Sequence, residues 1–182
     1  MQWEKLSETI QIAINDAHRF GTDAFLLEHF ATVHGIDTVC DLCAGCGIIG
    51  LLMLRRERPP QSVTAVEIAS DAVELMHHTA EFSSLTHFTP LQGDLREIRT
   101  LLSIHSFRLV TCNPPYFPAR SGYLCPEDSR RRARHEQEES CTIGEVCDAA
   151  AWLLQYGGRF CLCQRPERLT DVLLAMRQAG LE

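Results

Sequence analysis

The 182-residue sequence predicts an α/β fold whose doubly wound, mostly parallel sheet carries helices on both faces. Short apolar runs alternate along the chain with longer amphipathic segments, which is typical of parallel strands joined by helices. Hydrophobic residues make up 45% of the chain, enough for one domain of this size to bury a core. Because no internal repeat, low-complexity tract or linker interrupts the pattern, we expect a single domain over residues 1–182.

Five strands and seven helices are expected. The strands cover residues 38–42, 63–68, 87–92, 108–112 and 159–163. The helices that follow them cover residues 48–56, 70–82, 95–102, 142–155 and 166–179. Two more helices, at residues 6–18 and 22–33, are expected within the first 36 residues, ahead of a core over residues 37–182.

Several helix ends carry local signals. Ser70 can cap the helix that it begins, and Thr142 with Glu145 has the spacing of a capping box. Pro166 suits the first turn of the last helix, and the glycine pair at 157–158 can stop the helix before it. These signals support the predicted alternation of strands and helices.

Composition limits the function classes. The longest apolar run, residues 48–54, is far shorter than the roughly 18 residues that span a bilayer, and the first five residues begin no signal peptide. We therefore expect a cytoplasmic protein without a membrane partner. Nine scattered cysteines then indicate reduced thiols that act as small apolar filler. The net charge of −7 argues against a broad nucleic-acid surface but allows a local basic patch.

The first expected strand runs into a glycine-rich loop. Residues 45–50 fit the G-x-G-x-x-G pattern, and Glu67 follows roughly 20 residues later, which by itself would permit a nicotinamide dehydrogenase. Asp41 argues against it, because a carboxylate there would repel the pyrophosphate of a dinucleotide. The ammonium and sulfonium groups of S-adenosylmethionine would instead be attracted. Gly45 and Gly47 would let the methionine part lie against bare backbone.

The ends of the next two strands add to this candidate donor site. Glu67 can accept both ribose hydroxyls, and Ile68 beside it can cover one face of the adenine ring. Asp94 can accept a hydrogen bond from the adenine amino group, with Leu95 next to it. Each acid alone would usually be a solvated turn residue or a helix cap. Together, on successive strand ends, they indicate a donor site.

The fourth expected strand ends in Asn113, Pro114, Pro115 and Tyr116. A planar amine is a poor nucleophile because its lone pair is delocalised. Asn113 Oδ1, which would also lie beside the donor, and the Pro114 carbonyl can accept its two hydrogens and stabilise the positive charge that develops on methylation. The prolines fix the backbone, and Tyr116 offers a ring on which a base can stack. The plain alternative is a strand followed by a proline-stiffened turn.

In this order, residues 41–47, Glu67, Asp94 and residues 113–116 resemble the Rossmann-like S-adenosylmethionine-dependent amino-methyltransferases with an N-P-P-Y loop. That group modifies adenine N6 and guanine N2 in nucleic acids and glutamine N5 in release factors. The flanking segments, residues 19–27, Phe117, Gly122 and residues 133–136, are similar to the tRNA1(Val) (adenine-37-N6)-methyltransferase family.

The resemblance implies methylation of an adenine exocyclic amine in a tRNA anticodon loop, whose bases can be splayed out and stacked. Thr22 and Asp23 would help to close the donor pocket. The residues expected to contact the substrate are Tyr116, Phe117, Arg131, Arg134 and His135. The basic cluster at residues 130–135 is equally well explained as a solvated helix face.

Two positions depart from that family. Cys43 stands where a glycine is usual, and the chain stops at Glu182, where the family continues into closing strands and a basic tail. We therefore expect those closing strands to be absent, the chain to be truncated, and the fifth strand to have an exposed edge.

Other functions stay open. Cys40, Cys43 and Cys46 suggest a metal centre, but Cys40 falls within a strand and no fourth ligand has a recognisable spacing, so no metal is expected. The same chemistry could act on a glutamine amide in a protein or on another base amine. A third alternative is an inactive fragment that only holds the cofactor.

Overall fold

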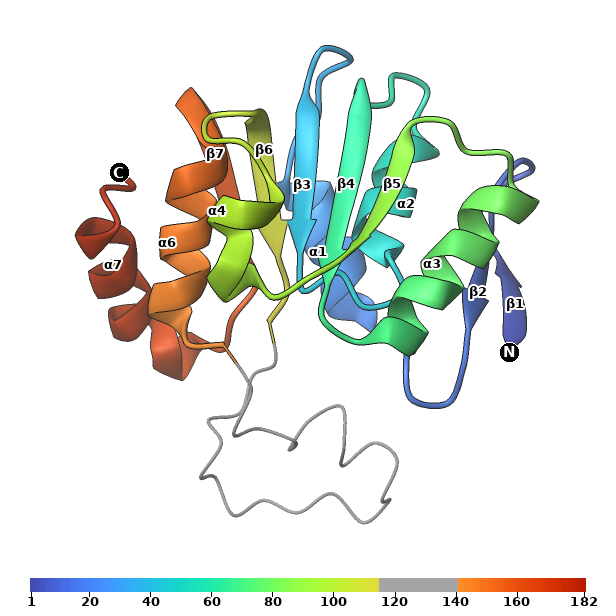
Figure 1. Cartoon of the computed structure of the whole chain (residues 1–182), viewed down its shortest axis with the longest axis horizontal. Helices are drawn as coiled ribbons and strands as arrows, with labels where there is room; N and C mark the ends of the chain where they lie inside the picture. Colours follow the sequence, from blue (N-terminus) through green and yellow to red (C-terminus); the bar gives the residue numbers. More distant parts are fainter. Residues whose placement is uncertain (115–140) are drawn as a thin grey trace.

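The computed structural model describes residues 1–114 and 141–182. Within them, five parallel strands form one sheet in the order β5-β4-β3-β6-β7 (Figure 1). The strands are β3 Thr38–Leu42, β4 Ser62–Glu67, β5 Phe88–Gln92, β6 Phe107–Cys112 and β7 Leu154–Leu162. The predicted parallel α/β sheet is confirmed.

Helices cover both faces of the sheet (Figure 1). On one face lie α1 Thr22–Phe30, α2 Ile48–Leu54 and α3 Ser70–Phe82, and on the other α4 Ile98–Leu101 and α6 Ile143–Leu153. The 3-10 turn η1 Leu95–Glu97 precedes α4, and η2 Pro166–Arg168 precedes α7 Leu169–Gln178, which packs on α6. No helix of the described residues is of a length and apolarity that would cross a membrane.

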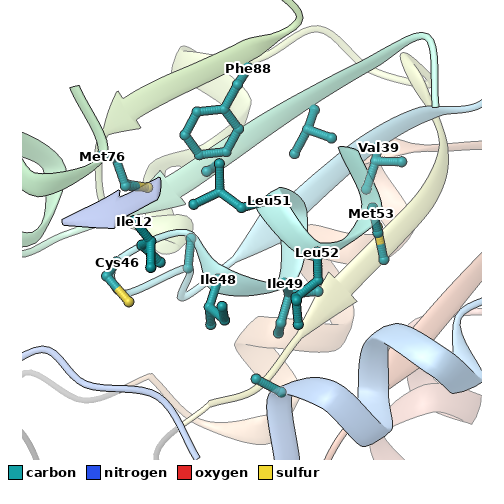
Figure 2. Close-up of a cluster of buried hydrophobic side chains, with 14 of the residues drawn as sticks. Ile12, Val39, Cys46, Ile48, Ile49, Leu51, Leu52, Met53, Met76 and Phe88 are labelled. Carbon is teal, nitrogen blue, oxygen red and sulfur yellow. The ribbon is translucent and has the colours of Figure 1, made fainter. Parts of the chain in front are cut away.

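Strand alternation divides the core into two clusters. In β3, Val39 belongs to the cluster under α2 and α3, whereas Cys40 and Leu42 belong to the cluster under α6. Figure 2 shows the first cluster, where Leu51 of α2 lies near Phe88 of β5. The two clusters pack the sheet between its helices and so fix the positions of the strand ends.

The prediction of an N-terminal helix at residues 6–18 is wrong. That region forms an antiparallel hairpin of β1 Gln2–Lys5 and β2 Gln11–Ile14. The hairpin packs along α3, where the Ala13 N–H donates to Thr79 Oγ1 over 2.9 Å. Buried Ile12 and Ile14 occur two residues apart, which is the spacing of one face of a strand. The segment is therefore held by hydrogen bonds between β1 and β2 and between β2 and α3, and not within a helix.

The boundary between α6 and β7 also differs from the prediction. The strand begins at Leu154, five residues before the predicted 159, because Gly157 adopts a φ of 73° and a register shift accommodates the glycine pair within the strand. At the other end of α6, the Thr142–Glu145 capping box is confirmed. Ser70 caps nothing, since Ala69 is the N-cap residue of α3 and no side chain bonds the first turn.

Candidate active site

The predicted donor residues meet at one edge of the sheet. Asp41 is the penultimate residue of β3, Glu67 ends β4, Asp94 follows β5 and Asn113 follows β6. The parallel pairing of these neighbouring strands brings their carboxyl ends together at the lower edge in Figure 1. The site is therefore assembled from residues that are up to 72 positions apart by number, from Asp41 to Asn113.

The glycine loop, residues 41–47 and called the donor loop below, contains three left-handed residues, Cys43, Gly45 and Gly47. Gly45 has a φ of 56° and Gly47 a φ of 81°, and α2 begins directly after Gly47. A Cβ on Gly47 would lie 2.8 Å from Phe88 Cζ and 3.0 Å from Met76 Sδ. On the Cβ side of Gly45, no described atom lies within 4 Å, so a ligand has room to approach its backbone.

Gly47→Ala is expected to destabilise the fold without touching a charged group. Both the left-handed backbone and the contact with Phe88 oppose a methyl group, and the unfolding free energy should fall by about 1–3 kcal/mol. Urea denaturation measures this loss. Gly35→Ala is the matched control, because a Cβ there meets only Pro59 O at 3.7 Å. Equal effects of the two substitutions would contradict the role given to the Gly47 contact.

Glu67 holds the loop and the start of α3 together. Its Oε2 accepts the Gly45 N–H over 2.8 Å, and its Oε1 accepts the N–H groups of Ile68 and Ala69 over 2.9 and 3.0 Å. These bonds occupy three of the roughly four acceptor positions of a carboxylate. Acceptance of two ribose hydroxyls, which stays a prediction, would therefore require one of these backbone bonds to lengthen.

Asp94 is engaged by Arg96. The Arg96 Nε donates to both carboxylate oxygens, at 3.0 and 2.8 Å, and the Arg96 backbone N–H donates to Oδ1 over 2.9 Å. The hydrogen bond from the Arg96 side chain is the main reason that the pKa of Asp94 is lowered. An adenine amino group would share this ionised carboxylate with Arg96. Nearby, Ile68 exposes 49% of its surface and Leu95 is buried.

Asp41 is the most perturbed acid of the site. It is fully buried, and Thr111 Oγ1 donates to its Oδ1 over 2.7 Å. Its Oδ2 accepts no hydrogen bond of normal distance and angle from any described residue. Burial raises the pKa of Asp41 to about 7, the charge of Glu67 adds to the rise, and the hydrogen bond from Thr111 and the polar backbone amide of Gly50 oppose it. A cation beside this carboxyl would relieve the cost of its burial.

The predicted acceptor loop, residues 113–116, is described only at its start. Asn113 is half-buried and Pro114 buried, directly after β6, whose Cys112 is paired with Leu42 of β3. This register brings Asn113 alongside the beginning of the donor loop. The other predicted residues of this region, Pro115, Tyr116, Phe117, Gly122, Arg131, Arg134 and His135, lie outside the described residues.

The structure also describes Thr22 and Asp23 and the three cysteines considered as a metal centre. Thr22 is exposed at the start of α1, with Asp23 in the first turn, and α1 packs against the helix that follows the donor loop. Cys40 and Cys46 belong to the core clusters on opposite faces of the sheet, so they cannot converge with Cys43 on one ion. Among the described residues, no group of three or more potential ligands could hold a metal.

Sequence reasoning missed Thr111 and Arg96, the partners of two predicted acids. Thr111 stands opposite Asp41 only because of the register between β3 and β6. Arg96 is two residues after Asp94, and its side chain reaches back because η1 turns the chain there. A threonine two residues before Asn113 carries no recognisable signal by itself.

Comparison with known proteins identifies the family. The model of the methyltransferase small domain matches residues 17–123. The chain belongs to the methyltransferase small domain family. This match covers the donor loop, Glu67, Asp94 and the first residues of the acceptor loop, so the resemblance seen in the sequence is confirmed.

Within this family, the chain is similar to curated tRNA1(Val) (adenine(37)-N6)-methyltransferases. It is 31% identical to that of Erwinia tasmaniensis over 80% of this chain and 58% of the relative, and 28% identical to that of Bacteroides thetaiotaomicron over 79% and 58%. The chain thus spans a little over half of the length of these two relatives.

Solved structures confirm the methyltransferase-like α/β fold. TrmN from Thermus thermophilus superposes with a TM-score of 0.58 and 20% identity, over 87% of this chain and 40% of that one. The precorrin 8w decarboxylase of Methanobacterium thermoautotrophicum reaches a TM-score of 0.64 with 16% identity, over 94% and 79%. At these identities the likeness concerns the fold alone.

Proposed function

We propose that the chain binds S-adenosylmethionine at the loop of residues 41–47 and transfers its methyl group to the exocyclic N6 amine of an adenine in the anticodon loop of a tRNA. The observation that carries the proposal is the parallel pairing of β3 with β6, because it brings the donor loop next to Asn113 and Pro114. The names of the similar curated proteins support the choice of substrate. A tRNA substrate also agrees with a cytoplasmic location.

The described residues fit this donor. Asp41 has one buried oxygen without a hydrogen-bond partner among the described residues, and a donor with an ammonium and a sulfonium supplies the positive charge that such an oxygen favours. Gly45 leaves open space for the methionine part. Ile68 is exposed at the strand end that precedes α3, where it can cover a ring. When bound, the donor would supply an electrophilic methyl group and, once its methyl–sulfur bond is broken, would leave as S-adenosylhomocysteine.

The chain's own residues then orient the nucleophile. Asn113 Oδ1 and the Pro114 carbonyl oxygen accept the two hydrogens of the amine, which draws its lone pair out of conjugation. As the carbon–nitrogen bond forms, these two acceptors stabilise the positive charge on nitrogen, and the proton leaves afterwards to solvent. No strong general base is needed, because the methylated ammonium is acidic.

Glu67→Gln is expected to weaken donor binding. Glutamine has one oxygen, whereas the two oxygens of Glu67 now accept three backbone N–H groups. The glutamine NH2 group would face at least one of these N–H groups and could not accept its hydrogen bond. We expect the affinity for S-adenosylhomocysteine to fall about tenfold or more, measured by calorimetry. Glu74→Gln, an exposed position in the middle of α3, is the matched control and should not change the affinity. Unchanged binding in Glu67→Gln would reject the role of this carboxylate.

The activity is tested by product identity. Labelled S-adenosylmethionine is incubated with the full chain and unmodified tRNA transcripts or, in parallel, cell protein, and the digested products are identified by mass spectrometry. We expect N6-methyladenosine, and none from a transcript whose anticodon-loop adenines are replaced by guanine. Methylglutamine in protein would instead support a protein amide substrate. Bound donor without any product would support a fragment that only holds the cofactor.

A further inference from the structure

Three cysteines meet beside the donor loop. Cys43 lies in the loop itself, Cys112 is the last residue of β6, and Cys141 precedes Thr142, the N-cap residue of α6. The Sγ atoms of Cys43 and Cys141 are 3.8 Å apart although 98 positions separate the residues. The thiol of Cys112 is the group that most raises the pKa of Cys43. The proposed function uses none of these thiols.

Cys43 and Cys141 are the pair best placed for a covalent bond. Both are half-buried and belong to irregular segments, whereas Cys112 is fully buried within a paired strand. A disulfide needs its sulfur atoms about 2.05 Å apart, so the two must approach by somewhat less than 2 Å. Cys43 already has a φ of 55°, a left-handed backbone that is strained for any residue other than glycine and that fixes the direction of its side chain.

We propose that Cys43 and Cys141 form a reversible disulfide that ties the donor loop to the start of α6 and weakens donor binding. The oxidant is a small-molecule disulfide such as oxidised glutathione. The thiolate of one cysteine attacks it and releases one glutathione thiol. The second cysteine then displaces the other glutathione from the mixed disulfide. One protein disulfide and two reduced glutathione molecules result from two protein thiols and one oxidised glutathione.

The chemistry of the cluster sets the conditions for this exchange. The Cys112 thiol is the main reason that the pKa of Cys43 is raised, and the hydrogen bond with Cys43 raises the pKa of Cys141. Because the thiolate is the attacking species, the exchange is slow at neutral pH and faster in alkaline solution. The pair therefore responds to sustained oxidation and not to brief pulses.

The link would act on the residues that hold the donor. Cys43 is adjacent to Ala44, whose N–H donates to Val66 O over 3.1 Å, and two residues from Gly45, whose N–H donates to Glu67. A pull on Cys43 toward α6 lengthens these bonds and moves the loop away from Glu67. This consequence rests on the proposed function, whereas formation of the disulfide does not.

The test uses the full chain, first reduced and then incubated with oxidised glutathione in mildly alkaline buffer. Peptide mapping without reductant identifies the linked cysteines, and calorimetry with S-adenosylhomocysteine measures donor affinity before oxidation, after it and after added dithiothreitol. We expect a Cys43–Cys141 peptide and an affinity about tenfold weaker, restored by the reductant. Cys141→Ala should bind as the reduced protein does and resist oxidation. Cys147→Ala, a buried cysteine of α6, should oxidise normally.

Other outcomes overturn the proposal. A Cys43–Cys112 link, no link at all, or a Cys43–Cys141 link with unchanged affinity would each do so. If the reduced protein binds no S-adenosylhomocysteine, the proposed donor site fails and the tether is judged separately, by hydrogen exchange of residues 43–50. Altered exchange on oxidation, absent in Cys141→Ala, would support the tether, and unchanged exchange would reject it.

Discussion

Asp41→Asn is expected to raise the free energy of unfolding at neutral and alkaline pH. Burial raises the pKa of this carboxyl from 3.8 to about 7, so over that range the folded protein keeps a proton that the unfolded chain has lost. Stability therefore falls as the pH rises from about 4 to about 7, and the full cost, on the order of 4 kcal/mol, is present above this range. Asparagine keeps an acceptor for Thr111 and carries no charge. Urea denaturation should show nearly equal unfolding free energies for the two proteins near a pH of about 4 and the largest difference above a pH of about 7.

The same substitution should weaken donor binding about 10- to 100-fold, the usual contribution of one charge-assisted hydrogen bond. In the unmodified protein, affinity for S-adenosylhomocysteine should decrease as the pH falls below about 7, because protonated Asp41 no longer attracts the ammonium group. Asp41→Asn should lose this pH dependence. Calorimetry across this pH range measures both effects.

Thr111→Val provides the matched control for this titration. Valine has the shape of threonine but cannot donate the hydrogen bond that lowers the pKa of Asp41. The midpoint of the affinity profile should therefore move to higher pH, while affinity in strongly alkaline buffer changes less. If Asp41→Asn binds the donor with the affinity and pH profile of the unmodified protein, Asp41 is not the acid that meets the donor.

Asn113→Ala is expected to lower turnover about 30- to 1000-fold, while donor affinity stays nearly intact. This loss of rate corresponds to an activation free energy that is higher by about 2–4 kcal/mol. The amide oxygen is needed when positive charge develops on the target nitrogen, so its loss raises the barrier more than it weakens binding of the cofactor. Single-turnover methyl transfer to tRNA and calorimetry with S-adenosylhomocysteine measure the two quantities separately.

The control for Asn113→Ala is Gln178→Ala, which removes an exposed amide at the end of α7, away from the strand ends of the site. It should change neither quantity. A loss of donor affinity in Asn113→Ala that matches its loss of rate would instead mean that Asn113 supports the donor pocket.

The core of the fold was predictable because its signals agree at every level. The strand β3 was predicted with its observed bounds, since a buried apolar run ends in a glycine loop. The N-terminal hairpin was missed because residues 6–18 satisfy two periods. Ile10 and Ile14 have the i, i+4 spacing of a helix, whereas Ile12 between them completes the two-residue period of a strand. Packing on α3 decides between the two, and a local pattern does not contain it.

The acids of the candidate site that follow strands were predictable from the sequence. The hydrogen bonds that their side chains make were not. Asp41, Glu67 and Asp94 follow apolar runs, so their common edge could be inferred from strand direction alone. The hydrogen bonds that now hold Glu67 to Gly45 and Asp94 to Arg96 depend on loop dihedrals that the sequence does not encode in a short motif. For the same reason, the contact between Cys43 and Cys141 was not foreseen.

The strand order also has a consequence for synthesis on the ribosome. In the order β5-β4-β3-β6-β7, the central strand β3 is made before every other strand of its sheet. Its pairing with β4 and β5 can form early, but the edge that faces β6 stays unpaired until Phe107–Cys112 has emerged. Because N-terminal segments fold first during translation, the nascent chain would present an apolar half-sheet over this interval. The period between synthesis of β5 and of β6 is thus when a chaperone would protect this protein most.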